Sequence, residues 1–223
     1  MHIGLIGGIG PAATDFYYQR LISNFAKHGR PLELTMVHAD SPTLLANLAK
    51  NDTASQVKIY KRLAERLAVA GADCVVVTSI GGHFCIGEFE DVSPLPVINM
   101  LSEVAKEVTA RGLKRIGIMG TRTVMETKFY GGLIDTEVIA PQGSQLEQVH
   151  DAYVTMATSG FVTDQQRQVF DETCRQFLER DRVEAILLGG TDLALVYDAA
   201  TSELPLVDGA AIHVDAITEQ ALS

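Results

Sequence analysis

The chain has 223 residues, three cysteines and a formal net charge of −10 at pH 7, a length that suits one large domain or two of about 100 residues each, with a hydrophobic core in either case. Its acidity, its scattered Lys and Arg residues and its odd cysteine count exclude a nucleic-acid partner and a disulfide framework. No apolar run approaches the roughly 20 residues that cross a bilayer and no basic leader is present, so we expect a cytoplasmic protein with a small-molecule ligand and no membrane partner.

Short β-branched runs alternate with longer segments of 3.6-residue period, which is typical of a parallel sheet flanked by helices and predicts an α/β fold. The expected strands are His2–Ile6, Leu32–His38, Cys74–Thr78, Val97–Ile98, Arg115–Met119, Thr136–Ile139, Ala185–Leu188 and Leu206–Val207. The expected helices are Thr14–Ala26, Ala54–Ala70, Ser102–Arg111, Thr127–Leu133, Gln145–Thr158, Thr163–Arg180 and Ala211–Leu222.

Three stretches of the first half are echoed in the same order in the second half. MHIGLIGGIG is echoed by LKRIGIMGTR, AGADCVVVTSIGG by DRVEAILLGGTD, and SPLPVINMLSEVAKEV by SELPLVDGAAIHVDAI. Such repetition predicts two similar parallel-sheet subdomains related by pseudo-twofold symmetry, 1–98 plus 209–223 and 99–208, with a site in the cleft between them. Ligands of α/β proteins also bind beyond the carboxyl ends of parallel strands, so the loops that follow the strands are the candidate site.

The first candidate loop is GGIGPAAT, residues 7–14, which follows a strand and opens a helix. Gly8, Gly10 and Thr14 could cradle a carboxylate, could form a loose dinucleotide fingerprint with Asp40 as the ribose-binding acid, or could simply make a tight turn. The nucleotide signal is weak because the last position is Ala13 and because Pro11 has no amide donor.

Two further loops carry polar side chains behind buried strands. VVVTSIGGHF, residues 75–84, offers Thr78 and Ser79 to a carboxylate and His83 as a general acid or base, although His83 could equally be a structural residue. GTRTVMET, residues 120–127, offers Thr121 as the better ligand contact, with Arg122 interpreted as a solvated loop residue.

The last strand-end loop is LGGTD, residues 188–192, in which Gly190 and Thr191 precede an acid. Asp192 could orient a base or a substrate, hold a ligand ammonium group, or cap the helix that follows. No cofactor or metal site is expected, because His38, His150, His213 and Asp40 lack the spacing of metal ligands.

At GGIGPAAT, GTRTVMETKFY, LGGTD and LPLVDGAAIH the chain resembles the aspartate/glutamate racemases, which are cofactor-independent amino-acid racemases. The resemblance covers essentially the whole chain. It implies two similar α/β domains, a homodimer, and a reaction that needs neither PLP nor metal. In that family two cysteines on opposite faces of the substrate remove and return the α-proton, since a cysteine pKa can be drawn toward neutrality.

Thr78 and Gly190 stand at these two cysteine positions, and Ile80 and Gln148 replace a family asparagine and lysine. The resemblance retains Gly8, Gly10, Thr14, Ser79, His83, Thr121, Thr191 and Asp192. Of the cysteines, Cys74 begins a strand about 13 Å from its loop and Cys174 lies in a helix, so Cys85 is the only thiol that could reach the cleft.

We therefore expect an enzyme that acts on a small amino or hydroxy carboxylate at the carbon next to the carboxylate. Thr78, Ser79 and Thr191 would hold the carboxylate, His83 or His150 would carry the proton, and Asp192 would orient the substrate. Gly190 would offer backbone amides and space to the ligand. Two alternatives stay open: a pseudo-racemase that binds a carboxylate without turnover, and a one-base lyase or decarboxylase.

Overall fold

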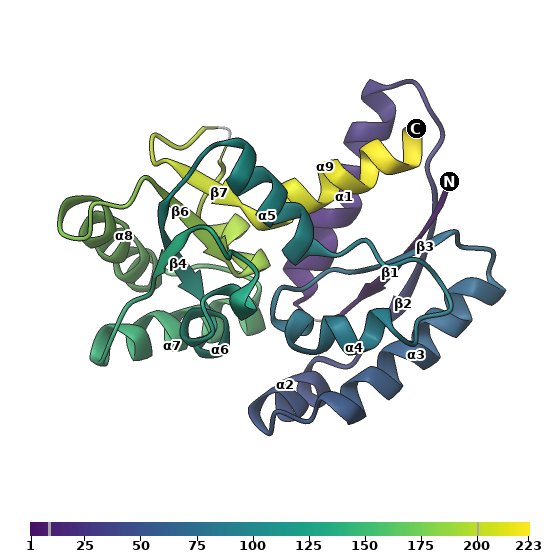
Figure 1. Ribbon diagram of the computed structural model, residues 1–223, viewed down its shortest axis with the longest axis horizontal. Coiled ribbons are helices and arrows are strands. Elements are labelled where there is room, and N and C mark those ends of the chain that lie inside the picture. Colours follow the sequence, from purple (N-terminus) through teal and green to yellow (C-terminus); the bar gives the residue numbers. More distant parts are fainter. Residues whose placement is uncertain (9, 200) are drawn as a thin grey trace. The chain divides into compact units, whose positions relative to one another are not determined.

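The computed structural model describes residues 1–8, 10–199 and 201–223 and divides the chain into two compact units (Figure 1). The first unit comprises Met1–Met100 with His213–Ser223, and the second comprises Leu101–Ile212. Each contains a parallel sheet, of three and four strands respectively, so the predicted α/β fold with two parallel-sheet units is confirmed. The predicted boundaries of the subdomains, 1–98 plus 209–223 and 99–208, stay a prediction.

The first unit is built on a sheet of order β2-β1-β3 with all strands parallel. Its elements are β1 (His2–Gly7), α1 (Pro11–Lys27), β2 (Glu33–His38), α2 (Ser41–Ala49), α3 (Thr53–Val69), β3 (Cys74–Val77), the 3-10 helix η1 (Gly81–Cys85), α4 (Ile86–Glu90) and the end of α9 (Gly209–Leu222). The central strand β1 is buried from Ile3 to Gly7, which explains its continuous apolar sequence.

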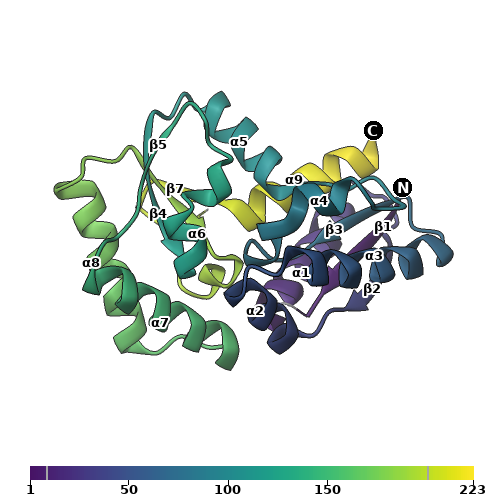
Figure 2. The same ribbon diagram turned by 60° about the horizontal axis from the view of Figure 1, so that its bottom comes forward.

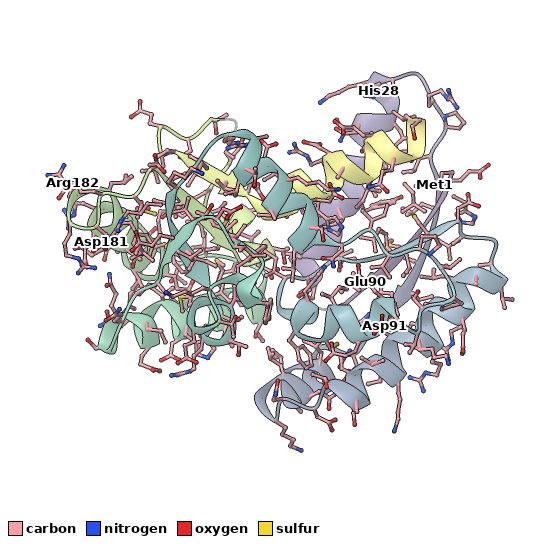
Figure 3. The ribbon with its side chains drawn as sticks, viewed as in Figure 1. Met1, His28, Glu90, Asp91, Asp181 and Arg182 are labelled. Carbon is pink, nitrogen blue, oxygen red and sulfur yellow. The ribbon has the colours of Figure 1, made fainter. Side chains whose placement is uncertain are left out.

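Helices of the first unit use an apolar stripe to cover this sheet. Helix α1 buries Ala13, Tyr17, Leu21 and Phe25, which recur at four-residue intervals and therefore share one face. Helix α3 packs on β1 and β2 (Figure 2). Glu90, which Figure 3 labels, is the last residue of α4. Its carboxylate accepts a hydrogen bond of 3.0 Å from the Asn99 side chain, which links the end of α4 to the segment before α5.

The second unit has a parallel sheet of order β5-β4-β6-β7. Its elements are α5 (Met100–Ala110), β4 (Arg115–Gly120), α6 (Arg122–Glu126), the 3-10 helix η2 (Phe129–Gly131), β5 (Glu137–Ile139), α7 (Ser144–Ser159), α8 (Asp164–Glu179), β6 (Ala185–Gly189), the 3-10 helix η3 (Thr191–Leu195), β7 (Leu206–Asp208) and the start of α9. Helices α7 and α8 pack together and against β4, with Tyr153, Met156, Phe170 and Phe177 in the core.

Some expected elements are wrong. The helix expected over 127–133 is replaced by α6, which begins earlier because Thr121 caps it, and by η2, where Lys128, Phe129 and Tyr130 have positive φ angles. Helix α2 was not expected, although Asp40 caps it through the Thr43 amide and Pro42 lies in its first turn. The expected strand Val97–Ile98 makes only a single bridge, Val75 to Val97. None of the described helices is long and apolar enough to cross a membrane.

Candidate functional site

The loop after β1 is held by bonds among its own residues. Gly8 has φ +94°, and a Cβ there would lie 2.3 Å from His38 Nδ1, so only glycine fits. The Thr14 hydroxyl accepts from the Gly8 amide at 3.0 Å and donates to the Gly10 carbonyl at 3.2 Å. The tight-turn interpretation thus explains both glycines, while a ligand contact of Gly8, Gly10 or Thr14 stays a prediction. Ile9 of the same motif lies outside the described residues.

Asp40, considered above as a ribose-binding acid, has a local role. Its carboxylate accepts from the Thr43 amide at 2.9 Å and caps α2. The Thr43 hydroxyl and amide lower the pKa of this carboxyl. The capping bond therefore accounts for Asp40 at this position without a bound nucleotide.

In the loop after β3, Thr78 and Ser79 are buried but differ in what they can offer. The Thr78 hydroxyl lies 3.3 Å from both the Ile6 carbonyl and the Thr14 hydroxyl, so its single proton already has acceptors. The Ser79 hydroxyl accepts from the Gly82 amide at 3.3 Å, and no described residue takes its own proton. Ser79 is therefore the better donor to a carboxylate.

His83 has one satisfied and one unsatisfied ring nitrogen. Nδ1 lies 2.6 Å from the Ser79 carbonyl, which can only accept, so Nδ1 carries the proton. Nε2 is buried and has no hydrogen-bond partner among the described residues. Burial lowers the pKa of His83 to about 4. The ring is thus neutral near pH 7, and the lone pair of the buried Nε2 has no hydrogen-bond donor among the described residues.

His213 supports the His83 ring from α9. Its Nδ1 accepts from the Tyr17 hydroxyl and its Nε2 donates to the Ile98 carbonyl, both at 2.8 Å, and its ring meets His83 edge-on at 6.2 Å. Burial, followed by the neighbouring His83, lowers the pKa of His213 to about 3. Because both nitrogens of His213 have partners, this ring positions His83 and does not carry protons itself.

The loop after β6 is filled by a side chain from α7. A Cβ added to Gly190 would lie 2.2 Å from Cε2 and 2.8 Å from the hydroxyl of Tyr153. The prediction that Gly190 leaves space for a ligand is therefore wrong, because the Tyr153 ring occupies that space; a contact through its amides stays a prediction. Sequence reasoning missed Tyr153, since nothing local links residue 153 to residue 190.

Asp192 does not cap a helix, so that alternative is wrong. Gly190, which has no side chain to make a cap, is the N-cap of η3, and Asp192 lies inside that helix. Asp192 is instead only 3% exposed and accepts from the Tyr153 hydroxyl at 3.1 Å. Burial first, and then the Asp192 charge, raises the pKa of Tyr153 well above its ordinary value, so the phenol keeps its proton.

Thr191 supplies the second buried polar atom without a partner in the described chain. Its hydroxyl lies near that of Tyr153 and partly offsets the rise in the pKa of that phenol, and its side chain is 3% exposed. Since buried polar groups are almost always hydrogen-bonded, Thr191 Oγ1 and His83 Nε2 mark where ligand atoms would complete the structure.

Thr121 and its neighbours form a capped turn. The Thr121 hydroxyl accepts from the Val124 amide at 3.4 Å, and the exposed Arg122 side chain pairs with Glu147. The Arg122 amide donates to His150 Nδ1 at 3.0 Å. His150 Nε2 therefore carries the proton in the neutral ring, and burial lowers the pKa of His150.

All three cysteines are free and buried. Burial raises the pKa of Cys85 to about 12 and that of Cys174 to about 11, while Cys74 starts β3, away from its carboxyl end. Each stays a thiol near neutral pH and is a poor proton acceptor. Over the described ranges, no group of three His, Cys, Asp or Glu side chains could hold a metal ion.

The sequence and the fold match known racemases. A family model described as Asp/Glu/Hydantoin racemase matches residues 6–217. The chain is 21% identical over 220 residues to the broad specificity amino-acid racemase RacX of Bacillus subtilis (strain 168), with 94% of this chain and 93% of RacX covered.

The chain is also similar to solved structures of this kind. A candidate Asp/Glu racemase from Yersinia pestis has a TM-score of 0.85 at 27% identity, with 100% of both chains covered. PH1733 from Pyrococcus horikoshii OT3, an aspartate racemase homologue, has a TM-score of 0.82 at 23% identity, with 100% of this chain and 99% of PH1733 covered. At this identity the second comparison concerns the fold alone.

Proposed function

Because the chain belongs to the Asp/Glu/hydantoin racemase family, we propose that it is a PLP-independent isomerase that acts on a small amino or hydroxy carboxylate. The reaction takes place at the carbon next to the carboxylate and does not use the two-cysteine route. The family match supports the class of reaction, and the side chains at the strand ends support the choice of proton carrier.

One observation carries this proposal: His83 Nε2 is a buried lone pair without a partner in the described chain, on a ring that is neutral near pH 7. The Nδ1 proton is fixed on the Ser79 carbonyl, so a proton taken from substrate can only bind at Nε2. A base of this kind contributes about 10²- to 10⁴-fold to a proton transfer.

The roles of the other site residues follow from the hydroxyl protons that they can donate and from their charges. Ser79 and Thr191 donate hydroxyl protons to the substrate carboxylate, with Thr78 contributing less because its proton already has acceptors. The Asp192 carboxylate attracts the substrate ammonium group. Ile80 and Gln148 replace a family asparagine and lysine, which favours a substrate side chain less acidic than aspartate or glutamate. Gln148 itself lines a groove of about 420 Å³ between α7 and α8 that none of these site residues lines.

We also propose a homodimer, as the resemblance implies, and a cytoplasmic location, as the composition and the cysteine content indicate. Light scattering at several protein concentrations measures the mass, which for a dimer is twice that of the 24.1 kDa chain. A monomeric mass at all concentrations contradicts the proposed dimer but does not contradict the proposed reaction.

The test is hydrogen exchange at the α-carbon. The protein is incubated in D₂O with single enantiomers of the common amino acids and of small hydroxy acids, and deuterium uptake and chirality are followed separately. We expect uptake with at least one substrate. Binding without uptake contradicts an enzyme and indicates the pseudo-racemase alternative, while loss of CO₂ or of a side-chain group indicates a lyase or decarboxylase.

Two histidine variants test the proton acceptor. Asparagine in His83→Asn keeps a donor for the Ser79 carbonyl and removes Nε2, and it should lower α-exchange about 100-fold. His150→Asn removes the other histidine considered for this role and should leave exchange within about twofold. Loss of exchange in His150→Asn alone would overturn the assignment to His83.

A further inference from the structure

A small cavity lies at the carboxyl end of β2, within the first unit. It has a volume of about 170 Å³ and is lined by the end of β2, the start of α2 and part of α3, two helices that pack together (Figure 1). Thr14, Thr78, Ser79 and His83 do not line it. The lining instead includes two opposite charges, one amide and two aliphatic side chains: Asp40, Arg62, Gln56, Ile59 and Leu63.

Gln56 indicates that a ligand binds in this cavity. The residue is only 1% exposed, and its Oε1 accepts from Asn47 Nδ2 at 2.9 Å. An amide nitrogen carries two donor hydrogens, and no residue in the described chain accepts from Gln56 Nε2. Since buried polar groups are almost always hydrogen-bonded, a ligand in the cavity would supply the acceptor that the Gln56 amide lacks.

Asp40 and Arg62 line the same cavity without pairing with each other. The Thr43 amide and hydroxyl both donate to Asp40 Oδ2, so Oδ1 has no donor in the part of the chain that the structure describes. The exposed Arg62 guanidinium makes no ion pair or hydrogen bond with any described residue. A ligand with charges of both signs is therefore favoured over a simple anion, which the Asp40 carboxylate would repel.

The size and the apolar part of the cavity restrict the ligand further. Ile59 and Leu63 lie one turn apart on α3 and give the cavity an aliphatic wall. A volume of about 170 Å³ equals that of about six molecules of liquid water, so a ligand of about six non-hydrogen atoms fits. A small aliphatic amino acid such as alanine has this size and both charges.

We propose that the cavity binds a small aliphatic amino acid as its zwitterion, at a site separate from the loops after β1 and β3. Arg62 and Gln56 donate to the carboxylate, and Asp40 accepts from the ammonium group. The ligand side chain packs on Ile59 and Leu63. Binding at this site does not depend on the proposed reaction, and no covalent bond forms or breaks there.

Backbone amide shifts of ¹⁵N-labelled protein locate the ligand. The probe is α-aminoisobutyrate, a zwitterion without an α-hydrogen, which the proposed reaction cannot change. Propionate, ethylamine and inorganic phosphate carry charge of one sign only and are titrated in parallel. We expect α-aminoisobutyrate to shift the amides of Thr43 and Leu63 and to bind about tenfold more tightly than any of these analogues, because only the zwitterion makes charge-assisted bonds at both ends.

Two charge variants and a matched control assign the ligand contacts. Arg62→Gln and Asp40→Asn each remove one charge from the cavity, and asparagine preserves the cap of α2. Each should weaken binding of α-aminoisobutyrate about tenfold or more, because one hydrogen bond to a charged group is lost. Arg66→Gln removes another exposed cation of α3, one turn further along and outside the cavity, and should leave the affinity within about twofold.

Four outcomes would overturn the proposed site. The amides of Thr43 and Leu63 do not shift, or propionate or phosphate binds as tightly as the zwitterion, which indicates a simple anion site. Alternatively, the shifts are confined to the loops after β1 and β3 and are unchanged in Arg62→Gln, or Arg66→Gln weakens binding as much as Arg62→Gln. Because none of these measurements involves exchange at the α-carbon, each of these outcomes leaves the proposed function standing.

Discussion

The loops after β3 and after β6 occupy the same place in their respective units but assemble their polar groups in opposite ways. In the first unit, Ser79 and His83 come from one short stretch of chain, and the imidazole is fixed by a carbonyl four residues away. In the second, the loop contributes Gly190 and Asp192, and the hydroxyl comes from Tyr153, 39 residues from its carboxylate partner.

The difference shows that two repeats of one design can place different chemistry at equivalent strand ends. A neutral imidazole with a free lone pair accepts a proton, whereas a phenol beside a carboxylate holds one. Each loop also has one buried polar atom without a hydrogen-bond partner among the described residues, His83 Nε2 after β3 and Thr191 Oγ1 after β6. The comparison therefore predicts that the two loops respond differently to acid, to added side-chain volume and to loss of a hydroxyl.

Acid should lower the stability of the first unit more than that of the second. The pKa of His83 is about 4 in the fold, against 6.5 when unperturbed. Between pH 6.5 and 4 the His83 imidazole binds a proton in the unfolded chain but not in the folded chain. The free energy of unfolding therefore falls as pH falls from 6.5 to 4, by about 3 kcal/mol from this group. Below about pH 4 the folded imidazole is also protonated, and its contribution falls no further.

Urea unfolding at a series of pH values measures this dependence. In His83→Asn the loss between the two pH values should be smaller by the contribution of that one group, while Tyr153→Phe should lose as much as the wild-type protein. An unchanged pH dependence in His83→Asn would show that the ring is not buried as the structure has it.

Added volume should affect the second unit most. Gly190→Ala places a methyl group into the Tyr153 ring, whereas Gly81→Ala in the equivalent loop of the first unit meets its nearest atom, Ser79 Oγ, at an ordinary 3.7 Å. We expect Gly190→Ala to lower the free energy of unfolding by about 2 kcal/mol, as overpacking does, and Gly81→Ala to change it by less than about 0.5 kcal/mol.

A double-mutant cycle assigns that cost to Tyr153. In a Tyr153→Ala background the space beside Gly190 is open, so Gly190→Ala should cost much less than in the wild-type protein. Residues that are in contact in the fold show coupling energies of about 0.5–3 kcal/mol in such cycles. Additive costs would mean that the ring does not fill the space beside Gly190.

The contrast between the loops also explains what the sequence could predict. Strand periodicity, glycine loops and the repeated order were sufficient for the α/β class and for two parallel sheets. They also drew attention to His83, Thr191 and Asp192. The neutral ring of His83 and the packing of Tyr153 on Gly190 depend on burial and on long-range contacts, which no local pattern encodes. Helix α2, in contrast, could have been predicted, because Asp40 as its N-cap and Pro42 in its first turn are local sequence signals for the start of a helix.

Loss of a hydroxyl should have the smallest effect, and it should again differ between the units. Thr14→Val removes the acceptor of the Gly8 amide and the donor to the Gly10 carbonyl, whereas Thr121→Val removes one longer capping bond to Val124. Since valine keeps the shape of threonine, the costs reflect hydrogen bonds alone, about 1–2 kcal/mol for Thr14 and less than about 1 kcal/mol for Thr121. Thermal unfolding of both variants measures the difference. A larger cost for Thr121→Val would mean that the turn after β4, not the glycine loop after β1, depends more on its threonine, and it would reverse the structural roles given to these two loops.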